Sequence, residues 1–240
     1  MQELISIKDL VISYNENRSL AVNHISLQVS AGEVLGLLGS NGAGKTSTLR
    51  ALAGLLPPTS GEITINGRVV DDSLNADRAR SLIGYCPDTG GLIRQATPRE
   101  HIGLSLGVRN KLSAWPYALD LISQFGLDAV LDTETTGFSH GMSRRLSVVL
   151  AVISAEKVLI LDEPFDGVDP LGVEVTINLI KKAKSEGLAV IVSTHLLSLL
   201  VEASDRICVM SAGKIIDDEP SAFFDGQEGS LRYSNLLKAK

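Results

Sequence analysis

The chain has 240 residues, a net charge of −6 and a hydrophobic content of 44%. This length suits one large domain or two small ones, and the acidic balance argues against a surface built to cover nucleic-acid phosphates, so we expect no nucleic-acid partner. Cys86 and Cys208 lack metal-ligand or redox spacing, which is typical of a reduced cytosolic protein, and neither a signal-peptide pattern nor an apolar run of the ~18 residues that cross a bilayer is present.

The first elements in chain order are strands. Residues 3–14 and 24–32 alternate apolar with polar side chains, the period of a half-buried antiparallel sheet. Residues 32–39 are a short apolar run that ends at glycine, typical of a buried central strand. Apolar residues at helical spacing then predict a helix over 45–56, which two prolines end.

Buried strands and helices alternate through the rest of the chain. In order, the sequence predicts a hairpin over 61–70 turned by Asn66-Gly67, a mostly helical stretch over 97–153, a buried strand over 157–164, a helix over 171–185, a third buried strand over 188–195 and a hairpin over 206–216 before a polar tail. Such alternation predicts an α/β fold with a mostly parallel central sheet. The alternating strands form an N-terminal antiparallel β subdomain, and residues of about 95–153 form a helical subdomain.

A phosphate-binding loop is predicted after the first buried strand. Gly39 to Thr46 read GSNGAGKT, the pattern G-x-x-x-x-G-K-[ST] in its required place between a strand and a helix. The glycines let backbone N–H groups point at phosphate oxygens, the helix start at Lys45 adds its positive end, and Lys45 can reach the β- and γ-phosphates while Thr46 ligates Mg²⁺. The predicted nucleotide-binding residues are Gly39, Ser40, Asn41, Gly42, Ala43, Gly44, Lys45, Thr46 and Ser47.

The next two buried strands end in residues that complete such a site. Asp162 ends the strand in VLILDEP, where it can hold Mg²⁺ through a water, and Glu163 beside it can polarise an attacking water. His195 in STH ends the following strand. Ligands collect at this edge of a parallel sheet, so we expect His195 to contact a γ-phosphate.

A second anion site is predicted in the segment from Phe138 to Met142, which reads FSHGM and is here termed the signature segment. The Ser139 hydroxyl, the amides around Gly141 and the start of a helix are all suited to bind an anion. One chain therefore carries two half-sites for phosphate.

Taken in order, the phosphate loop, the signature segment, LILDEP, DGVDP and STH resemble the motifs of the nucleotide-binding subunits of ABC transporters, over nearly the whole chain. The resemblance implies one phosphate-loop NTPase domain over residues 1–240, with the helical subdomain inserted in its core, and it implies ATP and Mg²⁺ as ligands. It also implies a second ATPase subunit, as a homodimer in a head-to-tail arrangement, in which Ser139 and Gly141 of one subunit touch the γ-phosphate held by the other. A separate integral membrane subunit would place the chain at the cytoplasmic face of the cell membrane.

Further residues gain roles only through this resemblance. Tyr14 matches the aromatic residue that stacks on adenine, and Asp169 in DGVDP matches the loop that signals across the dimer. Met142 replaces the glutamine common at the end of the signature segment, as in many exporting members. Asp88 in IGYCPD departs from the family's glutamine; its oxygen could still ligate Mg²⁺, but it adds negative charge near the phosphates and cannot donate a hydrogen bond.

Several functions compete for this set of motifs. An exporter ATPase is favoured, and an importer ATPase is the first alternative, although we expect none of the C-terminal regulatory domain that some import subunits carry. A non-transport ATPase acting on DNA or the ribosome would be expected to show a coiled-coil insertion or two fused ATPase domains. A phosphate-loop kinase or GTPase would leave FSHGM and STH unexplained, and no N-K-x-D motif for guanine occurs.

Overall fold

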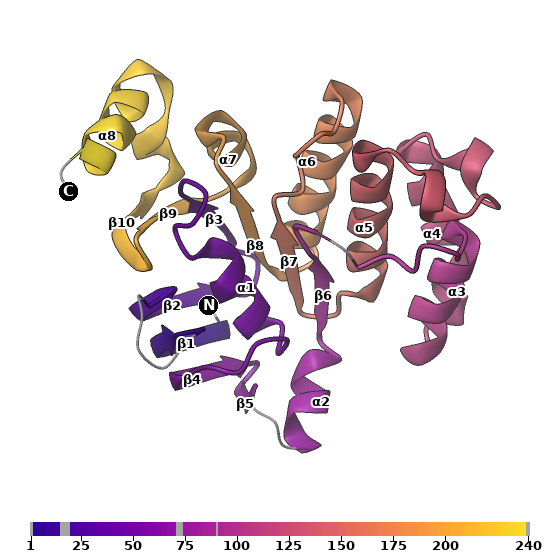
Figure 1. The fold of residues 1–240 in the computed structure, drawn as a ribbon, viewed down its shortest axis with the longest axis horizontal. Coiled ribbons are helices and arrows are strands. Elements are labelled where there is room, and N and C mark those ends of the chain that lie inside the picture. Colours follow the sequence, from indigo (N-terminus) through magenta and orange to yellow (C-terminus); the bar gives the residue numbers. More distant parts are fainter. Residues whose placement is uncertain (1, 15–19, 71–73, 90, 239–240) are drawn as a thin grey trace.

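The computed structural model describes residues 2–14, 20–70, 74–89 and 91–238. Two β-sheets and a block of helices beyond one edge of the larger sheet organise these residues (Figure 1). The predicted α/β fold, with a mostly parallel central sheet and an antiparallel β unit, is confirmed.

The larger sheet has six strands in the order β10-β9-β3-β8-β7-β6. Their bounds are β10 (Lys214–Pro220), β9 (Arg206–Ser211), β3 (Val34–Leu38), β8 (Ala189–Thr194), β7 (Val158–Asp162) and β6 (Ile83–Cys86). Strands β3, β7 and β8 are the predicted apolar runs and are buried along their whole length. All neighbours pair in parallel except β9 and β10, which form the predicted C-terminal hairpin.

The smaller sheet is antiparallel and has the order β2-β1-β4-β5. Its strands are β2 (Val22–Ser30), β1 (Glu3–Ile12), β4 (Ser60–Ile65) and β5 (Arg68–Val69). The hairpin between β4 and β5 turns at Asn66 and Gly67, whose φ angles are 50° and 72°. A two-residue turn with two positive φ angles matches the twist of a hairpin, which explains the Asn-Gly pair.

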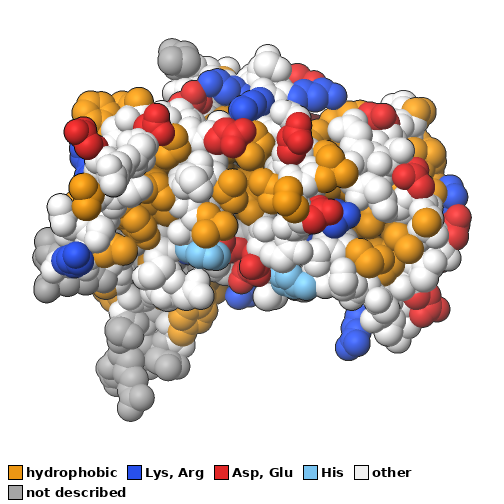
Figure 2. All heavy atoms as spheres, turned by 90° about the horizontal axis from the view of Figure 1, so that it is seen from above, with side chains coloured by type: hydrophobic (Ala, Val, Ile, Leu, Met, Phe, Trp, Pro, Cys, Tyr) orange, Lys and Arg blue, Asp and Glu red, His pale blue; other side chains and the backbone are white. Residues whose placement is uncertain are grey.

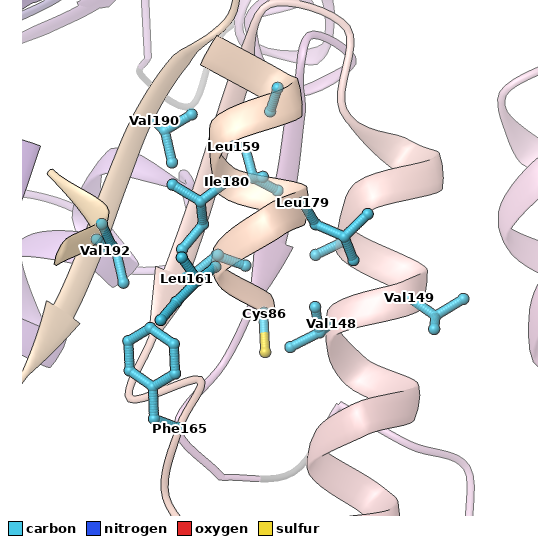
Figure 3. Close-up of a cluster of buried hydrophobic side chains, with 14 of the residues drawn as sticks. Cys86, Val148, Val149, Leu159, Leu161, Phe165, Leu179, Ile180, Val190 and Val192 are labelled. Carbon is cyan, nitrogen blue, oxygen red and sulfur yellow. The ribbon is translucent and has the colours of Figure 1, made fainter. Parts of the chain in front are cut away.

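The six-stranded sheet is covered on both faces. Helix α1 (Lys45–Leu52) lies between the two sheets and buries Leu49 and Leu52 against both. On the opposite face, α5 (His140–Ser154), α6 (Pro170–Ser185) and α7 (Leu197–Ala203) form the second hydrophobic cluster. Figure 3 shows side chains of α5, α6, β7 and β8 meeting in this cluster.

Helices occupy the stretch between β6 and β7, as predicted. It contains α3 (Pro98–Val108), η1 (Leu112–Ala114), α4 (Trp115–Gln124), η2 (Asp128–Val130), η3 (Thr135–Gly137) and α5. Helix α3 begins at a capping box, because the Thr97 hydroxyl accepts from the Glu100 N–H and the Glu100 carboxylate accepts from the Thr97 N–H. None of the described helices is both long and apolar enough to cross a membrane.

Four elements were not predicted: α2 (Leu74–Arg80), α7, η4 (Ser221–Phe224) and α8 (Gly226–Lys238). Helix α8 lies where the sequence suggested only a polar tail. Arg232 of α8 binds Asp217 at 2.8 Å and Glu219 at 3.4 Å, and its guanidinium lies 5.4 Å from the Phe224 ring centre. These contacts with β10 and η4 hold the helix, and the local sequence pattern does not reveal them.

Both cysteines are free thiols inside the larger sheet, Cys86 on β6 and Cys208 on β9. Burial raises the pKa of Cys86 to about 11 and also raises the pKa of Cys208. Both thiols are therefore protonated at neutral pH.

Strand β6 lies directly against α5, which yields a stability prediction. A Cβ at Gly84 would lie 2.0 Å from the carbonyl oxygen of Ala151. Gly84→Ala should therefore destabilise the protein by about 1–3 kcal/mol, measured as a lower midpoint in urea. The matched control is Gly107→Ala in α3, where an added Cβ meets no described atom within 4 Å apart from its chain neighbours and the adjacent backbone of its own helix, and alanine favours the helix by about 1 kcal/mol. Equal midpoints for the two variants would contradict this account.

Candidate functional site

The carboxyl ends of four parallel strands meet at one edge of the larger sheet. Leu38 at the end of β3 pairs with Thr194 of β8, and Asp162 at the end of β7 pairs with Ser193 of β8. Cys86 at the end of β6 pairs with Leu161. Four segments that follow these strand ends therefore lie next to one another: the phosphate loop, the loop with Asp88, the pair Asp162-Glu163, and His195.

The phosphate loop has the backbone that only glycine permits. Gly42 and Gly44 adopt φ angles of 81° and 105°, and a Cβ at Gly44 would lie 2.5 Å from the carbonyl oxygen of Ala21. Gly44, the N-cap of α1, has no side chain that could accept from the first N–H groups of the helix, so these N–H groups are available to an anion.

Lys45 is buried inside the loop. Its Nζ donates to the carbonyl oxygen of Gly39 at 2.7 Å and forms an ion pair with Glu163 Oε1 at 3.2 Å. The ammonium group thus links the phosphate loop to the end of β7.

Asp162 is a buried carboxylate with one bonded and one unbonded oxygen. Its Oδ1 accepts from Ser193 Oγ at 2.6 Å, while its Oδ2 has no hydrogen-bond partner among the described residues. Burial raises the pKa of Asp162, and the Ser193 hydroxyl, followed by the nearby Thr46 hydroxyl, favours the charged form and opposes that rise. The free Oδ2 and the Thr46 hydroxyl are oxygen donors of the kind that Mg²⁺ prefers.

Glu163 lies between two basic side chains. Its Oε2 is 3.2 Å from Nδ1 of His195, and its Oε1 faces Lys45. Its backbone has a φ of 48°, a costly conformation for glutamate. Its N–H donates to both the carbonyl oxygen and the hydroxyl of Ser193 at 3.1 Å, which holds this conformation in place.

Asp88 and Thr46 line one pocket of about 500 Å³ beside the phosphate loop. The carboxylate of Asp88 nevertheless pairs with Arg144 of α5, at 3.3 Å from Nη2. Tyr14 lies near the same loop: its hydroxyl is 3.0 Å from Ser47 Oγ, and its ring is exposed.

The signature segment lies at the start of α5 and contacts the loop after β7. Ser139 caps α5 by accepting from the Met142 N–H at 3.2 Å. A Cβ at Gly141 would lie 2.5 Å from the carbonyl oxygen of Gly167, and His140 Nε2 lies 3.1 Å from Asp166. Among the described residues, Ser139 has no hydrogen bond to the phosphate loop of its own chain.

Asp169 closes the same loop. Its carboxylate accepts from the Gly172 N–H at 3.0 Å, which caps α6, and pairs with Arg145 at 3.1 Å.

On the face drawn in Figure 2, two histidines lie close to acidic side chains, and Lys and Arg side chains are dispersed among acids.

Sequence reasoning missed three residues that organise the site: Ser193, Arg144 and Arg145. Ser193 could have been found, because it precedes Thr194-His195 on the strand that pairs with β7. The two arginines gave no signal, since an arginine in an amphipathic helix is usually solvated.

A glycine loop between a parallel strand and a helix, with an aspartate and a glutamate at the end of a nearby strand, defines a phosphate-loop nucleotide-binding domain. Comparison with protein families matches residues 22–166 to the family described as ABC transporter. The chain therefore belongs to the ABC transporter family, as the motif resemblance predicted.

Curated relatives agree with this assignment. The lipopolysaccharide export system ATP-binding protein LptB of Haemophilus influenzae is 32% identical over 216 residues, 89% of this chain and 89% of that protein. The bacitracin transport ATP-binding protein BcrA of Bacillus licheniformis is 33% identical over 224 residues, 92% of this chain and 71% of that protein. The chain also matches the mouse retinal-specific phospholipid-transporting ATPase ABCA4 at 33% identity, but spans only 10% of its length.

Solved structures share the fold. An ATP-binding subunit of an ABC transporter superposes with a TM-score of 0.88 at 27% identity, over 98% of this chain and 99% of that one. An ATP-binding cassette solved as a dimer with ADP and Pi has a TM-score of 0.81 at 21% identity, over 91% of this chain and 99% of that one.

The buried charge of Asp162 leads to a pH prediction. Because the pKa of Asp162 is raised on folding, stability falls as pH rises from the ordinary aspartate pKa of about 4 through the folded value. Asp162→Asn should therefore raise Tm at pH 7.5 in EDTA by roughly 2–4 °C, and the gain should vanish as the pH approaches about 4. Glu174→Gln, an exposed acid on α6, is the control and should show no such trend. A Tm difference that does not change with pH would exclude the charge of Asp162 as its cause.

Proposed function

We propose that the chain is an ATP-hydrolysing subunit that powers substrate export through a separate integral membrane subunit, working at the cytoplasmic face of the membrane as one ATPase domain with a helical subdomain at about 95–153. The observation that carries the ATPase activity is the Glu163 carboxylate, held beside the phosphate loop between Lys45 and His195. The names of LptB, an export-system protein, and of a Nod factor export ATP-binding protein that is 34% identical over 224 residues support the export direction.

Phosphate binding is assigned to the residues Gly39, Ser40, Asn41, Gly42, Ala43, Gly44, Lys45, Thr46 and Ser47. Lys45 exchanges its contacts with Gly39 and Glu163 for phosphate oxygens. This exchange frees the Glu163 carboxylate to accept a proton from water, so the same lysine couples phosphate binding to activation of the base. Tyr14 stacks on adenine.

Mg²⁺ is assigned to Thr46 and Asp162, whose oxygens fit a hard divalent cation. The buried Asp162 Oδ2 without a partner supports this role. When bound, the ion supplies charge neutralisation at the phosphates. His195, which pairs with Glu163, is assigned to the γ-phosphate.

Two copies of the chain are proposed to complete the site head to tail, as a homodimer. Ser139, Gly141 and Met142 of one copy then face the γ-phosphate on the other, and Asp169 links the two sites. Support comes from Ser139, which has no hydrogen bond to the phosphate loop of its own chain among the described residues, and from the dimeric cassette that shares the fold.

Glu163→Gln should lower ATP turnover by about 10²–10⁴-fold, because the amide cannot accept the proton, while the affinity for Mg-ATP stays close to wild type. Phosphate release and binding of a fluorescent ATP analogue measure the two effects. Wild-type turnover in Glu163→Gln would remove this residue from the mechanism.

Lys45→Ala serves as the contrasting variant. Loss of a charge-assisted contact should weaken nucleotide binding by about tenfold or more. Unchanged affinity would count against the phosphate-loop assignment, whatever the turnover.

The direction of transport needs the membrane subunit. In proteoliposomes in which this chain faces the outside, external ATP should drive substrate into the lumen if the system exports, and Glu163→Gln should stop it. ATP-dependent release from loaded vesicles of the same orientation would indicate import.

Dimerisation should depend on Ser139 of the opposite copy. On adding Mg-ATP, light scattering of Glu163→Gln should change from the 25.5 kDa monomer to twice that mass. Adding Ser139→Asp, which keeps a good helix cap but repels phosphate, should prevent the change, whereas Ser139→Asn, an equally good neutral cap, should allow it.

The head-to-tail arrangement predicts complementation. In the Glu163→Gln background, Lys45→Ala and Ser139→Asp chains should each stay monomeric with Mg-ATP. A mixture should dimerise, since one of the two composite sites then combines an intact Lys45 with an intact Ser139. No dimer in the mixture would contradict a shared site.

A further inference from the structure

The guanidinium of Arg144 is buried between the ends of β6 and β7. Nη1 donates to the carbonyl oxygens of Pro87 at 2.5 Å and Asp162 at 3.3 Å, and Nη2 donates to the carbonyl oxygen of Asp88. One side chain of α5, two residues after the signature segment, therefore holds the main chain at the carboxyl ends of two neighbouring strands.

A buried cation is costly unless a carboxylate balances it. The arginine side chain is only 3% exposed, and Asp88 is its ion-pair partner among the described residues, with Oδ1 3.3 Å from Nη2. The side chain of Asp88 is 38% exposed, so the pair reaches the surface through the acid.

Asp88 also lines two neighbouring surface pockets. It lines the pocket beside the phosphate loop with Thr46, and it lines a second pocket of about 320 Å³ with His140 and Arg144. The ion pair thus lies between the nucleotide side and the signature side of the subunit.

We infer that Arg144 is a positioning residue for the ATPase reaction and that Asp88 serves as its counter-ion rather than as a ligand of Mg²⁺. This accounts for an acid at a position where the motif resemblance leads us to expect glutamine, because Arg144 offsets the charge that would otherwise face the phosphates. By fixing the Asp162 carbonyl, Arg144 also fixes the backbone of the residue assigned to the metal. The inference rests on the proposed function for its metal-dependent part only.

A double-mutant cycle tests the pair. Without nucleotide, Asp88→Asn should lower Tm when position 144 is arginine, because the buried cation loses its partner, but should leave Tm unchanged in an Arg144→Gln background. Equal shifts in both backgrounds would overturn the counter-ion role. This arm does not depend on ATP binding.

The positioning role is tested by the Mg²⁺ concentration that half-saturates binding of a fluorescent ATP analogue, measured in the Glu163→Gln background. Arg144→Gln should raise it by roughly tenfold, as expected when support behind a metal-binding residue is lost, and Arg144→Lys should not restore it, because an ammonium cannot bridge three carbonyls. Asp88→Asn should leave this half-saturating Mg²⁺ concentration close to that of the chain with Asp88.

Two results would overturn the inference. A large rise with Asp88→Asn, whichever residue occupies position 144, would make Asp88 a metal ligand. An unchanged Mg²⁺ requirement in a folded Arg144→Gln variant would reduce Arg144 to a packing residue. If the unsubstituted chain bound no Mg-ATP, the proposed function would fail instead, and the melting cycle would still decide the pairing.

Discussion

The hydroxyl of Ser193 joins the two strands on which the site depends. It donates to the Asp162 carboxylate and accepts from the Glu163 N–H, which it can do because parallel pairing places Ser193 opposite Asp162. These two hydrogen bonds hold the side chain of Asp162 and the main chain of Glu163 in place, and they stabilise the left-handed backbone of Glu163. The geometry of the site is therefore set by the pairing of β7 with β8.

Three carboxylates lie at this sheet edge, and two of them are neutralised within the chain. Lys45 pairs with Glu163, and Arg144 pairs with Asp88. Asp162 has no cationic side chain paired with it among the described residues, and burial disfavours its charged form. A divalent cation would meet the remaining imbalance, so the charge pattern alone singles out Asp162 from its neighbours.

Sequence and structure agree best where chemistry requires a fixed spacing. The phosphate loop could be predicted because its glycines need positive φ angles and its lysine must begin a helix. The buried strands could be predicted because the strands of a covered parallel sheet are apolar throughout. Arg144 and α8 escaped prediction for a shared reason: each depends on partners distant in the chain, namely Pro87 for Arg144 and Asp217 for Arg232 of α8. The register that joins them is a tertiary property that no local pattern reports.

Because both thiols are buried, the folded chain exposes no cysteine to thiol reagents. Cys86 and Cys208 are fully covered and protonated, and a protonated, shielded sulfur reacts slowly with alkylating reagents and oxidants. A single cysteine placed on an exposed helix of the native chain would therefore be labelled alone. A spectroscopic probe attached there could then report changes around that helix without first removing the natural cysteines from the core.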